Sequence, residues 1–203
     1  MTRAPSRRTE RLVLRGWRDE DRDAFAALNA DRAVMRYFPE PLSREQSDAL
    51  FDRLDAAIRE HGWGLWALER LDTGRLVGFT GLAVPIHDLP FQPCVEVGWR
   101  LARSAWGHGF ATEAADSALQ VGFDEVGLDE VVSFTTVANQ RSRAVMERLG
   151  MRRDPAEDFE HPARPPGDPL RPHVLYRLRA DEWRRSAAAL RRCGGRGSCA
   201  GSR

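Results

Sequence analysis

One stretch of the sequence places glycines where a phosphate could bind. It reads AWGHGFATE over residues 105–113 and joins a predicted strand to a predicted helix. Gly107 and Gly109 lack side chains where the backbone must turn, so several N–H groups stay free and point one way at a helix N-terminus. That arrangement binds a phosphate or pyrophosphate. A tight strand–helix turn without a ligand is the plain alternative.

Two familiar phosphate-binding patterns do not fit this stretch. No Gly-Lys-Ser/Thr is present, so it is not the loop of nucleotide hydrolases. In the dinucleotide pattern the third glycine would fall on Thr112, and no acidic residue is clearly placed about 20 positions later, although Asp129 and Glu130 are near. The sequence therefore predicts an anion-binding turn of another kind.

Glu96 is the carboxylate best placed to act as a base. The segment from Cys94 to Leu101 alternates, with Glu96, Gly98 and Arg100 on the face opposite to the apolar side chains. The missing side chain of Gly98 leaves room for a substrate beside Glu96. A cross-strand ion pair with an arginine is the alternative role for this carboxylate.

A third motif, Asn139 with Ser142, follows a predicted strand and opens a helix. Asn139 is predicted as the N-cap and Ser142 as the third helical residue. The Ser142 hydroxyl could also donate a proton to a leaving group, directly or through water. Cys94 has no obvious histidine or aspartate partner, so we interpret it as a packing residue rather than a nucleophile.

The elements that must position these residues follow from hydrophobic spacing and turn signals. Ser43 with Gln46 is a capping box, Asp72-Thr73-Gly74 a hairpin turn, and Gly150 a left-handed helix cap. Helices are predicted over 19–30, 43–60, 112–126, 139–149 and 181–190, and strands over 12–17, 63–71, 75–86, 94–101, 130–137 and 173–179. Hairpin strands followed by alternating strands and helices indicate a single-domain α/β fold.

Composition excludes several classes of protein. The 203 residues carry 31 basic and 30 acidic side chains, and every basic residue is arginine. This balance argues against a dedicated nucleic-acid binder. An observation of salt-sensitive RNA binding would support that class of protein instead. The longest apolar-rich run without charge, 76–86, is too short to span a membrane, and the polar N-terminus is no secretory signal. Three scattered cysteines suit the cytoplasm and predict neither disulfides nor a metal site.

The combination of motifs closely resembles the GNAT N-acetyltransferase superfamily, within it the branch of the ribosomal-protein N-terminal acetyltransferases. The resemblance rests on RLVGF at 75–79, VEVGWRL at 95–101, the glycine-rich stretch, and Asn-x-x-Ser running into Leu-Gly-Met at 149–151. It covers about residues 11–179. The family signature Gln/Arg-x-x-Gly-x-Gly/Ala falls on 106–111, with Trp106 in place of Gln/Arg. The resemblance implies a mixed, mostly antiparallel sheet flanked by helices.

The resemblance also implies acetyl-CoA as co-substrate and a set of residues that bind it. The amides from Gly107 to Thr112 would hold the pyrophosphate, with His108 exposed on the phosphate side. The end of the preceding strand would contact the pantetheine and acetyl arm, and Asn139 and Ser142 would lie near the thioester. The implied cofactor-binding set is Trp99, Arg100, Leu101, Trp106, Gly107, His108, Gly109, Phe110, Ala111, Thr112, Asn139 and Ser142.

The expected reaction is direct attack of a primary amine on the thioester, with Glu96 as base and Ser142 as donor to the thiolate. Glu113 is expected to tie the loop to a neighbouring backbone group. The acceptor pocket is expected at 36–39 and in the loop 154–171, whose first half is acidic and whose second half carries Arg164 and Arg171.

The acceptor could be a protein N-terminus or a small amine such as a polyamine or aminoglycoside. A non-catalytic acyl-CoA sensor is the alternative from another class. We expect a monomer or homodimer with a flexible segment 1–10, one domain over 11–190, and a disordered tail over 191–203.

Overall fold

The computed structural model describes residues 6–186. The predictions for the tail from residue 191, and for the end of the helix over 181–190, lie outside these residues. Residues 180–186 are helical.

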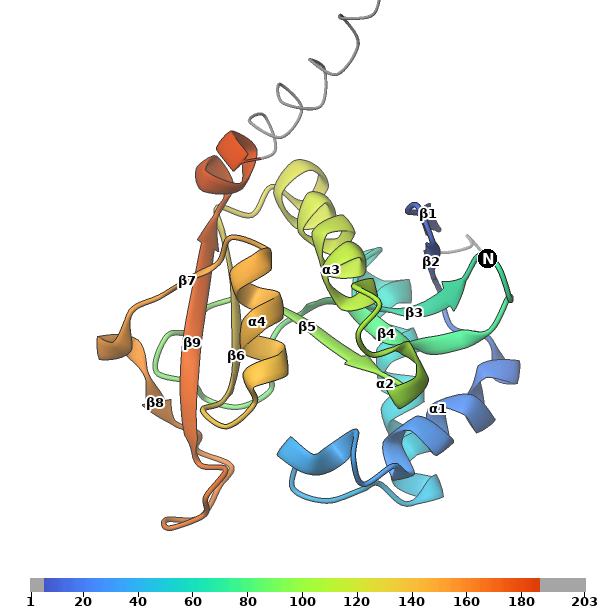
Figure 1. Cartoon of the computed structure of the whole chain (residues 1–203), viewed down its shortest axis with the longest axis horizontal. Coiled ribbons are helices and arrows are strands. Elements are labelled where there is room, and N and C mark those ends of the chain that lie inside the picture. Colours follow the sequence, from blue (N-terminus) through green and yellow to red (C-terminus); the bar gives the residue numbers. More distant parts are fainter. Residues whose placement is uncertain (1–5, 187–203) are drawn as a thin grey trace, which may run out of the picture.

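The chain forms one twisted sheet that is antiparallel at every junction except one (Figure 1). The order is β1-β2-β3-β4-β5-β6-β9-β7, with β8 also paired to β9. The parallel exception joins β5 to β6 in the middle of the sheet. The strands are β1 (Arg7–Arg8), β2 (Leu12–Arg15), β3 (Leu65–Arg70), β4 (Leu76–Ala83), β5 (Glu96–Leu101), β6 (Glu130–Thr136), β7 (Arg152–Arg153), β8 (Phe159–Glu160) and β9 (Pro172–Arg179). The predicted mixed, mostly antiparallel α/β domain is confirmed.

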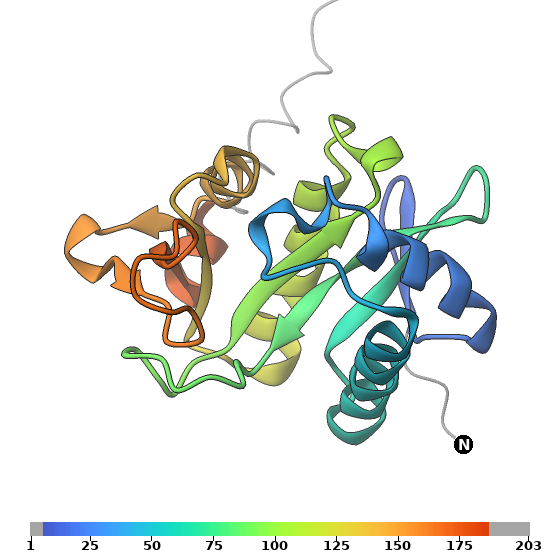
Figure 2. The same cartoon turned by 90° about the horizontal axis from the view of Figure 1, so that it is seen from below.

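Helices cover both faces of the sheet. Before the helical residues 180–186, the described part of the chain holds α1 (Arg22–Ala30), α2 (Arg44–His61), α3 (Phe110–Gln120) and α4 (Gln140–Arg148). α1 and α2 pack together and bring Phe25 and Phe51 into an aromatic cluster with Trp17 and Phe79. α3 lies on the opposite face, where it contacts β4, β5 and α4. Figure 2 shows the segment after α1 crossing the sheet on the side of α1 and α2.

The local signals predict the ends of several elements correctly. The Ser43 hydroxyl accepts from the Gln46 amide, and the Gln46 side chain accepts from the Ser43 amide, so the capping box is formed. Gly150 has a φ of +80° after α4, and Gly74 has a φ of +63° in the β3–β4 hairpin. α3 passes into a π-helical turn, Val121–Val126, so the predicted helical end at residue 126 is also found.

Several predicted bounds are wrong. The strands predicted over 12–17, 63–71 and 94–101 are shorter, the helix predicted from 19 begins at Arg22, and the helix predicted from 112 begins at Phe110. β4 stops at Ala83 rather than residue 86, because its partner β5 begins at Glu96 opposite Ala83 and leaves later residues unpaired. Val84 and Ile86 are consequently exposed. The loop predicted over 154–172 contains the 3₁₀ turn Pro155–Glu157 and strand β8, which pairs with the start of β9. β9 itself begins one residue early, at Pro172.

Candidate active site

Strands β5 and β6 meet at one point and then separate (Figure 1). Their only register pair is Glu96 with Val132, and the Val132 amide donates to the Val95 carbonyl at 2.9 Å. Backbone groups alternate sides along a strand, so those of Trp99 and Leu101 point toward β6 as Val95 does. Because β6 has turned away, this edge of β5 has no strand partner beyond Val97. An extended ligand could pair with it as a short strand would.

The glycine-rich stretch lies beyond the end of β5 and leads into α3. Gly107 and Gly109 have φ angles of +80° and +79°, which favour glycine. The first helical bond joins the Glu113 amide to the Gly109 carbonyl at 3.1 Å, and no side chain caps the helix. The amides of residues 110–112 therefore lack helical partners. Together with the positive end of the helix dipole they form an anion-binding turn.

Arg11 and Glu113 hold this turn from the outside. The Arg11 guanidinium donates to the His108 carbonyl at 2.8 Å and to Glu113 Oε2 at 2.7 Å. Glu113 Oε1 accepts from the Arg11 amide and from the Thr9 hydroxyl. Burial opposes ionisation of Glu113, but these hydrogen bonds and the Arg11 charge outweigh it and lower its pKa. The expected structural role of Glu113 is confirmed; the part of Arg11 was not predicted.

Replacing Glu113 with glutamine should weaken acetyl-CoA binding without affecting the chemical step. The amide cannot hold Arg11 by charge, so the His108 carbonyl loses its anchor. A loss of about 1 kcal/mol, the usual net contribution of one hydrogen bond, raises Kd about fivefold. Titration calorimetry measures Kd, and kcat at saturating acetyl-CoA should stay within twofold. Asp52→Asn, which breaks an ion pair of Asp52 with Arg22 on the α1–α2 side, is the control and should leave Kd unchanged. A Kd unchanged by Glu113→Gln would contradict the anchoring role.

Glu96 stands at the point where β5 and β6 separate. It makes no ion pair or side-chain hydrogen bond among the described residues, so the cross-strand ion pair is wrong for this structure. Desolvation by the surrounding protein raises its pKa to about 7. A Cβ added at Gly98, two positions along the same face, would meet no atom within 4 Å. A half-buried carboxylate with this pKa beside open space has the properties of a general base near neutral pH.

Arg100 lies on the same face as Glu96, toward α1. Its Nη1 donates to Asn29 Oδ1 at 2.5 Å, and the guanidinium lies 4.1 Å from the ring centroid of Phe38 and 5.2 Å from that of Phe79. Burial lowers its pKa to about 10. Its side chain is thus on the face opposite to Trp99 and Leu101. The guanidinium therefore lies toward Asn29, Phe38 and Phe79.

The start of α4 forms the other side of the opening between β5 and β6. Asn139 Oδ1 accepts from the Ser142 amide at 3.3 Å, which confirms the N-cap, and Asn139 Nδ2 donates to Thr135 at 3.0 Å. The Ser142 hydroxyl has no hydrogen-bond partner among the described residues. Arg141 reaches across and lies 4.4 Å from the Trp106 ring centroid. Trp106 in turn donates to the Leu101 carbonyl at 2.9 Å. These contacts bring the α4 start, the end of β5 and the glycine-rich turn together.

Most acidic side chains of the loop 154–171 are paired with arginines. Asp158 pairs with Arg153, Glu157 with Arg177 at 2.9 Å, and Glu160 with Arg171 at 2.7 Å. Asp154 caps the Ala156 amide. Three of the four acidic side chains in the first half of this loop are therefore paired with arginines, and Asp154 is exposed with no arginine partner among the described residues.

A wall of aromatic and histidine side chains lies beyond Glu96 on the same face. Phe134 follows Val132 by two residues on β6 and therefore shares the face of Glu96. The rings of Phe91 and Phe159 contact it at 5.8 Å between centroids, and His161 lies 4.8 Å from His173. Burial lowers the pKa of both histidines, that of His161 to about 4, so the wall is uncharged at neutral pH.

Cys94 comes just before β5 and is partly buried. Its desolvation, and next the charge of Glu96, raise the pKa of the thiol. A thiol that resists ionisation is a poor nucleophile, which supports the interpretation of Cys94 as a packing residue.

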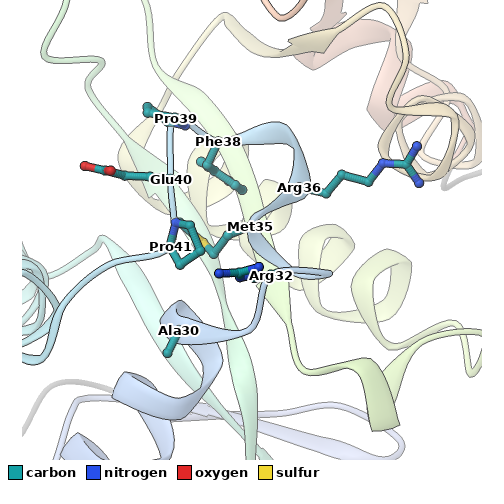
Figure 3. A pocket seen from close by; sticks show the side chains of 8 residues that line it. All are labelled: Ala30, Arg32, Met35, Arg36, Phe38, Pro39, Glu40 and Pro41. Carbon is teal, nitrogen blue, oxygen red and sulfur yellow. The ribbon is translucent and has the colours of Figure 1, made fainter.

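A depression in the surface lies between the end of α1 and the segment that follows this helix (Figure 3). Arg36 extends away from the other labelled side chains, while Phe38 stacks on Arg100. The residues that line this depression are Ala30, Arg32, Met35, Arg36, Phe38, Pro39, Glu40 and Pro41. The predicted acceptor segment 36–39 is thus beside the face that carries Glu96 and Arg100.

Residues 6–186 contain no group of three or more histidine, cysteine, aspartate or glutamate side chains that could hold a metal ion. No helix in this part of the chain is long and apolar enough to cross a bilayer.

Comparisons with known proteins identify the family of the chain and proteins that share its fold. Residues 11–152 match the family model described as acetyltransferase (GNAT) domain. The chain is 30% identical over 188 residues to FsC-acetyl coenzyme A-N(2)-transacetylase of Aspergillus fumigatus, covering 89% of this chain and 79% of that protein. It matches the crystal structure of an acetyltransferase from Agrobacterium tumefaciens at 29% identity and a TM-score of 0.69, covering 88% and 96% of the two chains.

A Vibrio cholerae spermidine N-acetyltransferase, solved with CoA and spermine, is 19% identical. Its TM-score is 0.65, with 85% of this chain and 97% of that one covered, and it shares the fold.

Proposed function

We propose that this chain, which belongs to the GNAT acetyltransferase family, acetylates a primary amine by direct attack in a ternary complex with Glu96 as base. Family membership makes it an acetyl-CoA-dependent acyltransferase. The observation that carries the proposed site is the separation of β5 from β6. It leaves an unpaired strand edge with Glu96 at one end and an anion-binding turn at the other.

The residues present fit acetyl-CoA along this edge. The amides from Gly107 to Thr112 would bind the pyrophosphate, with His108, Phe110 and Ala111 forming the rest of the turn. The backbone of Trp99 and Leu101 would pair with the pantetheine arm, and Trp106 would close the end of β5. Asn139 and Ser142 would flank the thioester from the α4 side.

Glu96 accepts the proton that the amine must lose. The amine nitrogen attacks the thioester carbonyl carbon, the C–S bond breaks, and the thiolate leaves. Glu96 takes the amine proton directly or through water, and Ser142 donates to the thiolate sulfur. The products are the acetylated amine and CoA thiol. Glu96 releases the amine proton to solvent, and the Ser142 hydroxyl, which has given its proton to the sulfur, is reprotonated from solvent.

The acceptor we propose is a protein N-terminus, in line with the resemblance to the ribosomal-protein branch, or a small molecule with an amine. Arg100 and the exposed Arg32 and Arg36 near the proposed acceptor side disfavour a polycation such as a polyamine. A non-catalytic acyl-CoA sensor would have no use for a base poised at a pKa of about 7.

Thiol release from acetyl-CoA tests the proposal. The protein is mixed with acetyl-CoA and a panel of N-terminal peptides, amino acids, aminoglycosides and polyamines, and free thiol is followed with a chromogenic disulfide. Amine-dependent release with a matching acetylated product, seen by mass spectrometry, is expected. Tight acetyl-CoA binding with no release across the panel would favour the sensor.

Ser142→Ala should lower kcat by a smaller factor than a change at the base. Removing one hydroxyl donor to the leaving thiolate costs about 1–1.5 kcal/mol, or roughly tenfold in kcat. The loss should not shrink as pH rises, because the donor acts after the amine has attacked. A pH–rate profile with a saturating acceptor measures this. A kcat equal to wild type throughout the profile would remove Ser142 from the mechanism.

A further inference from the structure

The Arg100 guanidinium has the form of a carboxylate-binding site. Its faces lie against the rings of Phe38 and Phe79, and Nη1 is held by Asn29. Nε is buried without a hydrogen-bond partner. No aspartate or glutamate within the described residues pairs with this arginine, although many other arginines of the chain have such a partner. A buried, unsatisfied guanidinium N–H is costly unless a ligand supplies an acceptor.

The unpaired edge of this guanidinium suits a planar anion. Stacking on Phe38 and Phe79 fixes the plane, so that Nε and Nη2 together form a fork matching the two oxygens of a carboxylate. Asn29 is fully buried and its amide donates to Ser47, so the side chain that orients the fork is itself held. The arginine is therefore preorganised rather than a mobile surface charge.

Arg100 is also placed correctly with respect to the proposed base. It follows Glu96 by four residues on the same face of β5, so the two Cα atoms lie about 13 Å apart. The residue between them on that face is Gly98, whose missing side chain leaves open space. With a hydrogen bond at each end and the reach of both side chains, an amine at Glu96 and an anion at Arg100 are separated by roughly 5–8 Å.

We propose that the acceptor carries a carboxylate near its amine and that Arg100 binds this carboxylate while Glu96 receives the amine proton. The inference rests on the proposed function and names the substrate class of its site. Two sources supply this chemistry: a free amino acid whose amine is several bonds from its carboxylate, or a peptide N-terminus followed by an acidic side chain.

Matched acceptor pairs test the proposal in the wild-type protein. The first arm compares β-alanine, 4-aminobutyrate, 5-aminopentanoate and 6-aminohexanoate with the carboxamide of each. The second arm compares peptides that begin Ser-Asp or Ser-Glu with those that begin Ser-Asn or Ser-Gln. We expect kcat/KM to be at least tenfold higher for the carboxylate member in one arm, and that arm identifies the source. Equal rates within pairs in both arms would overturn the proposal while leaving the proposed function intact.

Arg100→Gln should abolish this preference, so that carboxylate and carboxamide acceptors react at rates within twofold of each other. Phe38→Ala removes a partly exposed ring that stacks on the guanidinium. It should reduce the preference for carboxylate acceptors without disturbing the hydrophobic core.

If the Arg100→Gln protein does not fold, an inhibition experiment with the wild-type protein takes its place. Pentanoate should inhibit acetylation of pentylamine at concentrations where pentanamide does not. Equal inhibition by pentanoate and pentanamide would contradict the proposal that Arg100 binds a carboxylate. If no amine of any kind releases thiol, the proposed function fails first.

Discussion

Glu96→Gln should lower kcat at pH 7 by roughly 10²–10⁴-fold, the usual scale of general-base catalysis. The amide keeps the shape of the side chain but cannot accept the proton. Acetyl-CoA binding should stay near normal, because Glu96 lies at the end of the open β5 edge away from the anion-binding turn. Single-turnover rates with saturating acceptor measure the chemical step. Retention of most of kcat in this variant would mean that the proton leaves by another route.

The pH dependence of kcat distinguishes a general base from a residue that takes no part in proton transfer. Since burial raises the pKa of Glu96 to about 7, wild-type kcat should fall in proportion to the ionised fraction below pH 7. The deficit of Glu96→Gln should shrink as pH approaches the pKa of the amine, because neutral nucleophile then forms in solvent. A pH-independent deficit would point to a purely structural defect.

Stability gives an independent readout of the same carboxylate. A carboxyl group whose pKa is raised on folding binds protons more tightly in the folded state, so wild-type stability falls as pH rises through 7. Glutamine has no such penalty. Glu96→Gln should therefore melt higher than wild type at pH 8, with no such gain below the ordinary pKa of about 4.5. An ion-paired glutamate would give the opposite result, a loss of stability at pH 8.

Local patterns in the sequence were enough for the parts of the site that one segment builds. The turn before α3 and the Asn139 cap depend on residues within four positions of each other, and both are found as predicted. Resemblance to a family supplied what no local pattern could, the expected ligand and the mixed, mostly antiparallel sheet.

Long-range pairing decided the rest. The environment of Glu96 depends on where β6 joins β5, and the anchor of the glycine-rich turn comes from Arg11, about 100 residues away. The charge of the loop 154–171 likewise depends on Arg177 of β9, which pairs with Glu157. In the sequence Arg100 shares the strand face of Glu96, and it is assigned to the cofactor arm by the family resemblance. Only packing against Phe38, Phe79 and Asn29 separates it from the other arginines, because burial is a property of the fold rather than of the residue.

Gly109→Val should weaken acetyl-CoA binding at least tenfold, or about 1.4 kcal/mol. Gly109 has a φ of +79° at the N-cap of α3, a conformation that a β-branched residue adopts only with strain. Among residues 6–186, the one atom within 4 Å of an added Cβ is Arg11 Nη2, at 3.4 Å. The added carbon therefore causes little steric conflict with the protein itself. It would obstruct a bound pyrophosphate more strongly, because the phosphate oxygens must approach the backbone amides closely. Relief of the strain would also rotate those amides away from a common direction.

Gly127→Val separates the two effects. Gly127 has the same φ, +79°, and no atom within 4 Å of an added Cβ, but it follows the far end of the same helical segment. Both variants should therefore lose similar stability from backbone strain, and only Gly109→Val should lose affinity for acetyl-CoA. Thermal melts and titration calorimetry on the pair measure the two quantities separately. If the folded Gly109→Val protein binds acetyl-CoA as the Gly127→Val protein does, the pyrophosphate is not held by this turn, because strain alone would then account for everything that the substitution changes.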